Sequence, residues 1–227
     1  ADVTDDGFVW RVDLRLRPEG ARGALVNSLA AAERYYEAFG RLWERAALLR
    51  ARPVAGDLEL GERILLALSP FVWRRAVVPR IAVTMYELVH RAREELSPAP
   101  ERDLKLGPGG IREAEFFVQT LQLIWGGREL RIRARPTLEA VARLRDAGLV
   151  TYREAEDLQS AYVALRRAEH AVQMSTGVQT HTLPREPEAL NRLAVSLGFA
   201  DSAALSTDLA QHTGNVGRLL ASLLPAE

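Results

Sequence analysis

KLGPGGIREAEFFVQTLQLIWGG, from Lys105 to Gly127, is the stretch that most directly indicates the fold. Gly109–Gly110 precede a run that contains neither proline nor glycine, and Gly126–Gly127 follow it. Apolar residues recur through the run at helical spacing, and glycines commonly stand at helix ends. The stretch therefore predicts a helix from Ile111 to Trp125.

Helical spacing continues on both sides of this segment. Further helices are predicted over Ser28 to about Arg52, Leu60–Leu68, Pro70–Leu96 with an interruption at Pro79, Pro136–Ala147, Tyr152 to about Ser175, Glu186–Leu197 and Ser202–Leu224. No convincing strand follows residue 26, so we expect a fold that is mainly α.

Near the start of the chain, apolar and charged residues alternate from Phe8 to Arg17. This period of two predicts a half-buried strand, and Pro18 would end it. We expect the apolar side to pack against helices and the charged side to be exposed or to face a cleft. The apolar side holds Phe8, Trp10, Val12, Leu14 and Leu16, and the charged side holds Arg11, Asp13, Arg15 and Arg17.

Composition limits the class of protein. The 227 residues contain 30 basic and 30 acidic side chains, which argues against general nucleic-acid binding but allows a local basic patch. The absence of cysteine excludes disulfides and thiolate zinc sites. No apolar run approaches the roughly 20 residues that cross a bilayer. The chain is expected to be a cytoplasmic protein with no membrane partner.

The charged side of the predicted strand carries groups suited to phosphoryl transfer. A carboxylate such as Asp13 can hold a magnesium ion, and arginine forks neutralise phosphate oxygens. The same alternation is also typical of a solvated edge strand. One aspartate is too few ligands for such a metal site, and no Gly-Ser followed by Asp-x-Asp occurs in the sequence.

A polar stripe runs along the predicted helix from Ile111. It consists of Arg112, Glu115, Gln119 and Gln122. The stripe is either the solvated side of an amphipathic helix or one wall of a cleft. The glycines before it do not form a P-loop, because Lys105 precedes them and no Lys-Ser/Thr follows.

Two other sets of polar residues have a simpler interpretation. Glu37, Arg41 and Glu44 lie at helical spacing and predict ion pairs along one helix. The four histidines are dispersed, and none stands at zinc-ligand spacing.

Several motifs together resemble a known family, the bacterial glutamine synthetase adenylyltransferase/adenylyl-removing enzymes. The motifs are Val12-Asp13-Leu-Arg15-Leu-Arg17-Pro18-x-Gly20, Gly40-Arg41-x-Trp43-Glu44-Arg45 and Lys105-Leu-Gly-x-Gly-Gly-Ile-Arg112-Glu-x-Glu115-Phe. Shorter strings resemble the first, adenylyl-removing half. They are Pro70-Phe-Val-x-Arg74-Arg75, Gln122-Leu-Ile-x-Gly-Gly-Arg128-Glu129, Ala168-Glu-His170 and Gln179-Thr-His181-Thr-Leu-Pro184.

This resemblance implies a domain organisation. Residues 1–79 would be the C-terminal remnant of a nucleotidyltransferase α/β domain, and residues 80–227 a helical bundle like that of the PII-uridylyltransferases. The Gly-Ser and Asp-x-Asp segment of the family is expected to precede residue 1, so the chain alone is expected to be inactive.

The resemblance also implies an activity. Phosphate would remove AMP from a tyrosine of glutamine synthetase and release ADP. Asp13 would be a ligand of Mg²⁺ or Mn²⁺, and Arg15 and Arg17 would contact phosphate or position Asp13. Lys105, Arg112 and Glu115 would shape the far wall of the site or the domain junction.

The implied partners are glutamine synthetase, the PII signalling protein, ATP or ADP, and phosphate. Two alternatives stay open. The chain could belong to the ATP-consuming adenylyltransferase half, or it could be a non-catalytic module that binds PII or glutamine synthetase.

Overall fold

The computed structural model describes residues 13–14, 16–76 and 80–225. The chain divides into two compact units, Ala1–Trp73 and Arg74–Glu227. The domain boundary predicted between residues 79 and 80 stays a prediction.

The first unit is a small cluster of helices. Its elements are the 3₁₀ turn η1 (Gly20–Arg22) and the helices α1 (Leu29–Ala38), α2 (Leu42–Leu48) and α3 (Leu58–Val72). Helix α3 contacts both α1 and α2. The Tyr36 and Phe71 rings pack 5.2 Å apart, and buried Arg45 donates to the carbonyl of Val72 at 3.0 and 3.3 Å. These contacts hold the end of α3 against the other two helices.

The single helix predicted from Ser28 to about Arg52 is wrong, because the chain breaks between α1 and α2. A Cβ on Gly40 would lie 2.4 Å from the Phe71 ring, so only glycine allows this approach. Glu44 accepts from the backbone N–H of Arg41 at 2.8 Å and caps the new helix. The predicted ion pairing of Glu37, Arg41 and Glu44 along one helix is therefore replaced by a capping interaction.

The helix boundary predicted between Leu68 and Pro70 is also wrong. Pro70 lies inside α3, which continues to Val72. Burial of Phe71 and Val72 in the core of the unit favours this last turn, so tertiary packing outweighs the cost of a proline in the helix.

The strand predicted from Phe8 to Arg17 is not found at the residues that the structure describes. Asp13 and Leu14 have no regular structure, and Leu16 and Arg17 form a bend. Leu14 is 56% exposed and Leu16 63% exposed, so the expected packing of Leu14 is wrong. A strand needs neighbours to share its hydrogen bonds, and the described part of the chain supplies no other strand. Phe8, Trp10, Arg11, Val12 and Arg15 lie outside the described residues.

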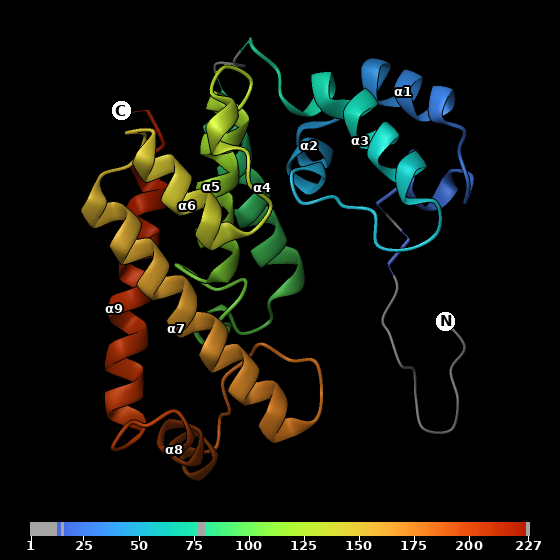
Figure 1. Cartoon of the computed structure of the whole chain (residues 1–227). Helices are drawn as coiled ribbons and strands as arrows, with labels where there is room; N and C mark the ends of the chain where they lie inside the picture. The colour runs from blue at the N-terminus through green and yellow to red at the C-terminus, as the bar shows by residue number, and fades with distance from the viewer. Residues whose placement is uncertain (1–12, 15, 77–79, 226–227) are drawn as a thin grey trace, which may run out of the picture. The chain divides into compact units, whose positions relative to one another are not determined.

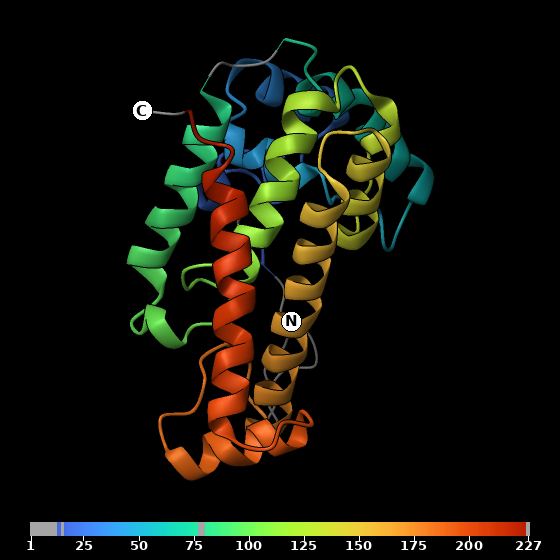
Figure 2. The same ribbon diagram turned by 90° about the vertical axis from the view of Figure 1, so that its left-hand side faces the viewer.

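The second unit is a helical bundle. Its elements are α4 (Ile81–Leu96), η2 (Pro100–Arg102), α5 (Ile111–Trp125), η3 (Leu130–Ile132), α6 (Thr137–Asp146), α7 (Tyr152–Thr176), α8 (Pro187–Ser196) and α9 (Ser202–Ala221). Helices α7 and α9 run side by side, and α8 lies across one end of the pair (Figure 1 and Figure 2). The mainly α fold is confirmed, and the described residues form only one isolated β-bridge, between Asp103 and Thr182.

Helix α5 is the central helix of this bundle. Its bounds agree with the prediction, and it contacts α4, α6, α7 and α9. Ile111, Phe117, Val118 and Leu121 are buried as expected, whereas Ile124 is partly exposed. Within the described ranges, no helix is long and apolar enough to cross a membrane.

Candidate functional site

The loop that leads into α5 is organised by a buried aspartate. Oδ1 of Asp103 accepts from the backbone N–H groups of Lys105 and Leu106 at 2.9 and 2.8 Å. Its Oδ2 accepts from the Ser97 hydroxyl at 2.6 Å and lies 3.4 Å from Nε2 of His181. One carboxylate therefore joins the end of α4, the entry loop and the loop after α7.

A second buried carboxylate fixes the first turn of α5. Glu113 forms an ion pair with Arg93 of α4 and accepts from the N–H of Gly109 at 3.0 Å. Arg93 also donates to the carbonyl of Leu106 at 2.8 Å. Gly109 has φ +68°, and a Cβ there would lie 2.0 Å from the carbonyl oxygen of Thr213 in α9. The glycine therefore lets the entry loop lie directly against α9.

The N-terminus of α5 is not an open phosphate site. The N–H of Ile111 donates to the carbonyl of Leu104, and the N–H of Arg112 donates to that of Lys105, both at 2.9 Å. Buried Glu113 adds negative charge beside these groups. A helix N-terminus attracts phosphate through unpaired N–H groups, and the entry loop already occupies two of them.

Three of the four residues in the polar stripe of α5 are buried. Glu115 is 6% exposed, and Gln119 and Gln122 are similarly covered, so the stripe is not a solvated face. Oε1 of Glu115 lies 3.0 Å from Nη2 of Arg166 and accepts from the Tyr162 hydroxyl at 3.3 Å. Both partners lie on α7.

The same arginine bridges two buried carboxylates. Nη1 of Arg166 lies 2.7 Å from Oε2 of Glu169, one turn further along α7. Burial alone would lower the pKa of Arg166, but hydrogen bonds to Glu169 and Tyr162 and the charge of Glu115 raise its pKa above the usual value. Arg166 stays charged, and the cluster serves as an electrostatic link between α5 and α7.

The predicted residues of the first unit have different surroundings. Asp13 is exposed, and Arg15 lies outside the described residues. The guanidinium of Arg17 donates to the carbonyl of Leu14 and, at 3.3 and 3.4 Å, to that of Gly23. Arg17 therefore shapes the turn next to Asp13.

The predicted residues of the second unit fall close together. Lys105 and Arg112 are partly exposed and share the backbone hydrogen bond at the start of α5. The guanidinium of Arg112 lies 5.6 Å from the centre of the Phe116 ring. Lys105, Arg112 and Glu115 thus lie within the first turns of α5 and the loop before it.

A divalent metal does not fit the described residues as a complete site. Among them, no group of three or more histidine, cysteine, aspartate or glutamate side chains could hold an ion. Asp13 would supply one ligand of the several that Mg²⁺ or Mn²⁺ needs.

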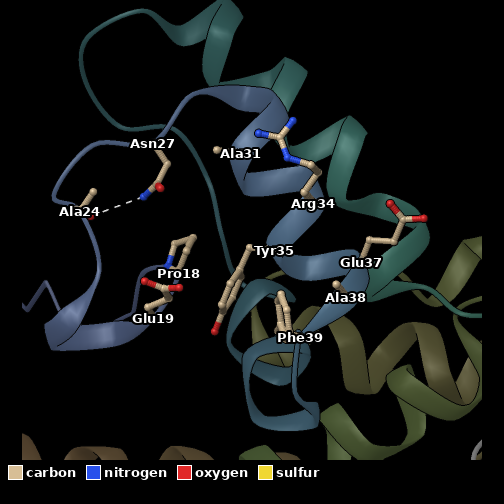
Figure 3. A pocket seen from close by; sticks show the side chains of 10 residues that line it. All are labelled: Pro18, Glu19, Ala24, Asn27, Ala31, Arg34, Tyr35, Glu37, Ala38 and Phe39. Carbon is tan, nitrogen blue, oxygen red and sulfur yellow. Dashed lines mark hydrogen bonds between the residues drawn. The ribbon is translucent and has the colours of Figure 1, made fainter.

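An open groove of about 590 Å³ lies in the first unit beside α1 (Figure 3). Its lining includes Pro18, Asn27, Tyr35 and Phe39, and Arg34 is the basic residue of the lining. None of the predicted site residues lines the groove. We assign no chemistry to it.

Sequence reasoning missed Arg93 and Arg166, the cations that neutralise Glu113 and Glu115. One signal was available for Arg166, because its spacing to Glu169 is that of a helical ion pair. The contact between Arg166 and Glu115 joins residues 51 positions apart, and no local spacing predicts it.

Comparison with known families agrees with the helical fold. Residues 83–224 match the family model described as GlnD PII-uridylyltransferase, and residues 1–67 match the model described as glutamate-ammonia ligase adenylyltransferase. The first match covers more than half of the chain, so the chain belongs to the GlnD PII-uridylyltransferase family.

Comparison with individual proteins shows more specifically which enzymes the chain is similar to. The chain is 46% identical to a protein of Mesorhizobium japonicum over 90% of its length, 41% identical to one of Hahella chejuensis over 98%, and 43% identical to one of Rhizobium meliloti over 99%. Each is named bifunctional glutamine synthetase adenylyltransferase/adenylyl-removing enzyme, which confirms the resemblance stated from the motifs. The matches cover 21%, 23% and 23% of these relatives, so the chain spans about a fifth of their length.

Proposed function

We propose that this chain is part of an enzyme that controls glutamine synthetase by reversible adenylylation, and that its half removes the adenylyl group. The observation that carries the proposal is the match to enzymes of this name at 41–46% identity across nearly the whole chain. The strings around Arg74, Arg128, His170 and His181 favour the adenylyl-removing half over the ATP-consuming half.

The proposed reaction is a phosphorolysis. An oxygen of inorganic phosphate attacks the phosphorus of the AMP group, and the bond from that phosphorus to the tyrosine oxygen breaks. The tyrosine oxygen takes up a proton, and the products are ADP and the free hydroxyl. Such a reaction requires cations where negative charge develops.

The residues of this chain would contribute in two places. Asp13 is proposed as one ligand of the Mg²⁺ or Mn²⁺ of the complete enzyme, and Arg15 is proposed to contact phosphate. The bonds of Arg17 to Leu14 and Gly23 support a positioning role for that side chain. Lys105 and Arg112, at the start of α5, are proposed to shape the domain junction.

A chimaera tests this function with the residues of this chain in place. The chain replaces the matching segment of the Rhizobium meliloti relative, and release of ADP from adenylylated glutamine synthetase with phosphate is measured. The chimaera is expected to be active, and Asp13→Asn is expected to lower its rate at least about a hundredfold, as for loss of a metal ligand. ATP-dependent adenylylation by the same chimaera is expected to persist.

Asp57→Asn is the matched control, because Asp57 is also exposed and caps α3 through a hydrogen bond that asparagine keeps. If Asp13→Asn abolishes adenylylation and spares phosphorolysis, the chain belongs to the ATP-consuming half. If both activities survive, Asp13 is not a metal ligand.

A non-catalytic role is the second candidate, and the lack of a metal-binding cluster among the described residues favours it. In that case the isolated chain would bind the PII protein or glutamine synthetase in the cytoplasm without turnover. Titration calorimetry of the chain with each purified protein tests this role.

A further inference from the structure

One surface of the second unit concentrates positive charge. The chain as a whole has no net charge, with 30 basic and 30 acidic residues. Six arginines nevertheless lie in two segments beside the turn after α5, and Glu129, which pairs with Arg131 at 2.8 Å, lies among them. This arginine patch consists of Arg74, Arg75, Arg128, Arg131, Arg133 and Arg135.

Buried Gln122 of α5 determines how half of the patch is displayed. Its side-chain amide donates to the carbonyls of Ile132 and Ala134 at 3.0 and 2.9 Å. Ile132 and Ala134 are buried, so the alternate residues Arg131 and Arg135 are exposed. A side chain of the central helix thus holds the segment in a register that turns arginines outward.

The other half of the patch is joined to it through Gly127. A Cβ on Gly127 would lie 2.1 Å from the carbonyl oxygen of Arg74, so only glycine allows the two segments to touch. Nε of Arg128 donates to the carbonyl of Arg75 at 3.1 Å. The strings around Arg74–Arg75 and Arg128–Glu129, separate in the sequence, therefore form one surface.

Apolar side chains accompany the arginines. Trp125 is 39% exposed and Leu130 is 63% exposed, on either side of the turn. Tryptophan and arginine are among the side chains enriched at protein–protein interfaces, whereas a site for free phosphate is built from cations and backbone N–H groups. The mixture fits a protein surface better than a free anion.

We infer that the arginine patch is a docking surface for an acidic face of a partner protein. The inference rests on the proposed function, under which glutamine synthetase must dock on this enzyme. Opposite charge on the partner would speed association and fix its orientation, and Trp125 and Leu130 would supply the apolar contact.

A charge-reversal pair tests the inference. Arg75→Glu with Arg135→Glu changes two exposed arginines of the patch. Arg185→Glu with Arg192→Glu makes the same change in charge just before and within α8, at the opposite end of the bundle (Figure 1 and Figure 2). Biosensor binding of purified glutamine synthetase to the immobilised chain is measured at several salt concentrations, and circular dichroism shows that each variant is folded.

The patch variant is expected to bind at least about tenfold more weakly, mainly through slower association, with a smaller salt dependence. The α8 variant is expected to stay within about twofold of the parent chain. Equal weakening in both variants, or no weakening in either, would contradict the inference.

Two further probes address other ligands. The inference would be overturned in favour of nucleic acid if a duplex DNA bound more tightly than glutamine synthetase and if this binding depended on Arg75 and Arg135. Competition by millimolar inorganic phosphate at constant ionic strength would overturn it in favour of a simple anion site. If the chimaera is active but the patch variant binds glutamine synthetase as tightly as the parent chain does, the docking surface is refuted and the proposed function stays intact.

Discussion

Nη2 of Arg166 lies 3.0 Å from Oε1 of Glu115, and this contact joins the longest helix of the bundle to its central one. The carboxylate is almost fully buried, whereas the side chain of Arg166 is 31% exposed. Water therefore screens the charge of Arg166, whereas the charge of Glu115 is stabilised by the protein groups around it.

Loss of this carboxylate should destabilise the second unit. Glu115→Ala is expected to lower the free energy of unfolding by about 2 kcal/mol, less than for a fully buried pair because Arg166 reaches solvent. Glu139→Ala breaks an exposed pair with Arg143 and should cost about 0.5 kcal/mol or less. Urea unfolding of the chain measures both. Equal effects would show that burial of Glu115 adds nothing.

The same residue has an expected effect on activity. In the chimaera, Glu115→Ala should reduce phosphorolysis by more than its loss of stability explains, because the family resemblance predicts that Glu115 shapes the far wall of the site or the domain junction. Rates are compared well below the unfolding temperature, with Glu139→Ala as the control. Full activity in Glu115→Ala would limit this residue to the link between α5 and α7.

Gly109 and Gly56 form a matched pair for backbone effects. Both have positive φ, +68° and +75°, but a Cβ would meet the Thr213 carbonyl at the first and open space at the second. Gly56→Ala should cost about 1 kcal/mol for the left-handed conformation, and Gly109→Ala at least about 2 kcal/mol more. Urea unfolding tests the difference. Similar losses would mean that the entry loop moves away from α9 at little cost.

Alkaline pH should weaken the first unit. Burial, then the charge of Glu44 and the neighbouring Tyr35, raise the pKa of Tyr36 from 10.0 to about 12. The folded state therefore holds this proton more tightly than the unfolded state, so stability falls as the pH rises from about 10 to about 12. Tyr36→Phe should flatten this dependence, and Tyr152→Phe, at an exposed site, should not. Absorbance of tyrosinate at rising pH, read together with thermal unfolding, provides the measurement.

How much the sequence could predict depended on where the determining contacts lie. Helix α5 has glycines at both ends and a regular apolar pattern, so its bounds were predictable from local chemistry. The break at Gly40 depends on the Phe71 ring, which comes from another helix. The continuation of α3 through Pro70 likewise depends on contacts made after folding. Local sequence patterns therefore do not predict the helix break at Gly40 or the continuation of α3 through Pro70.

At the candidate site, too, the features that depend on contacts between distant residues could not be predicted from the sequence. The helical spacing of Glu115 left open whether its stripe faced water, and the structure shows Glu115 buried against α7. The roles of Asp13, Arg15, Lys105 and Arg112 stay predictions, because chemistry at these positions needs groups that the described residues do not supply.

The backbone pairing around Asp103 has a consequence for the integrity of the chain after cleavage. Leu104 donates to the carbonyl of His181, and Leu183 donates to that of Arg102, both at 2.9 Å. The nearby turn at Val178–Gln179 is exposed and open to a protease. A nick there would leave two pieces that share one hydrophobic core, so the bundle would persist as a non-covalent complex whose covalent break shows only under denaturing conditions.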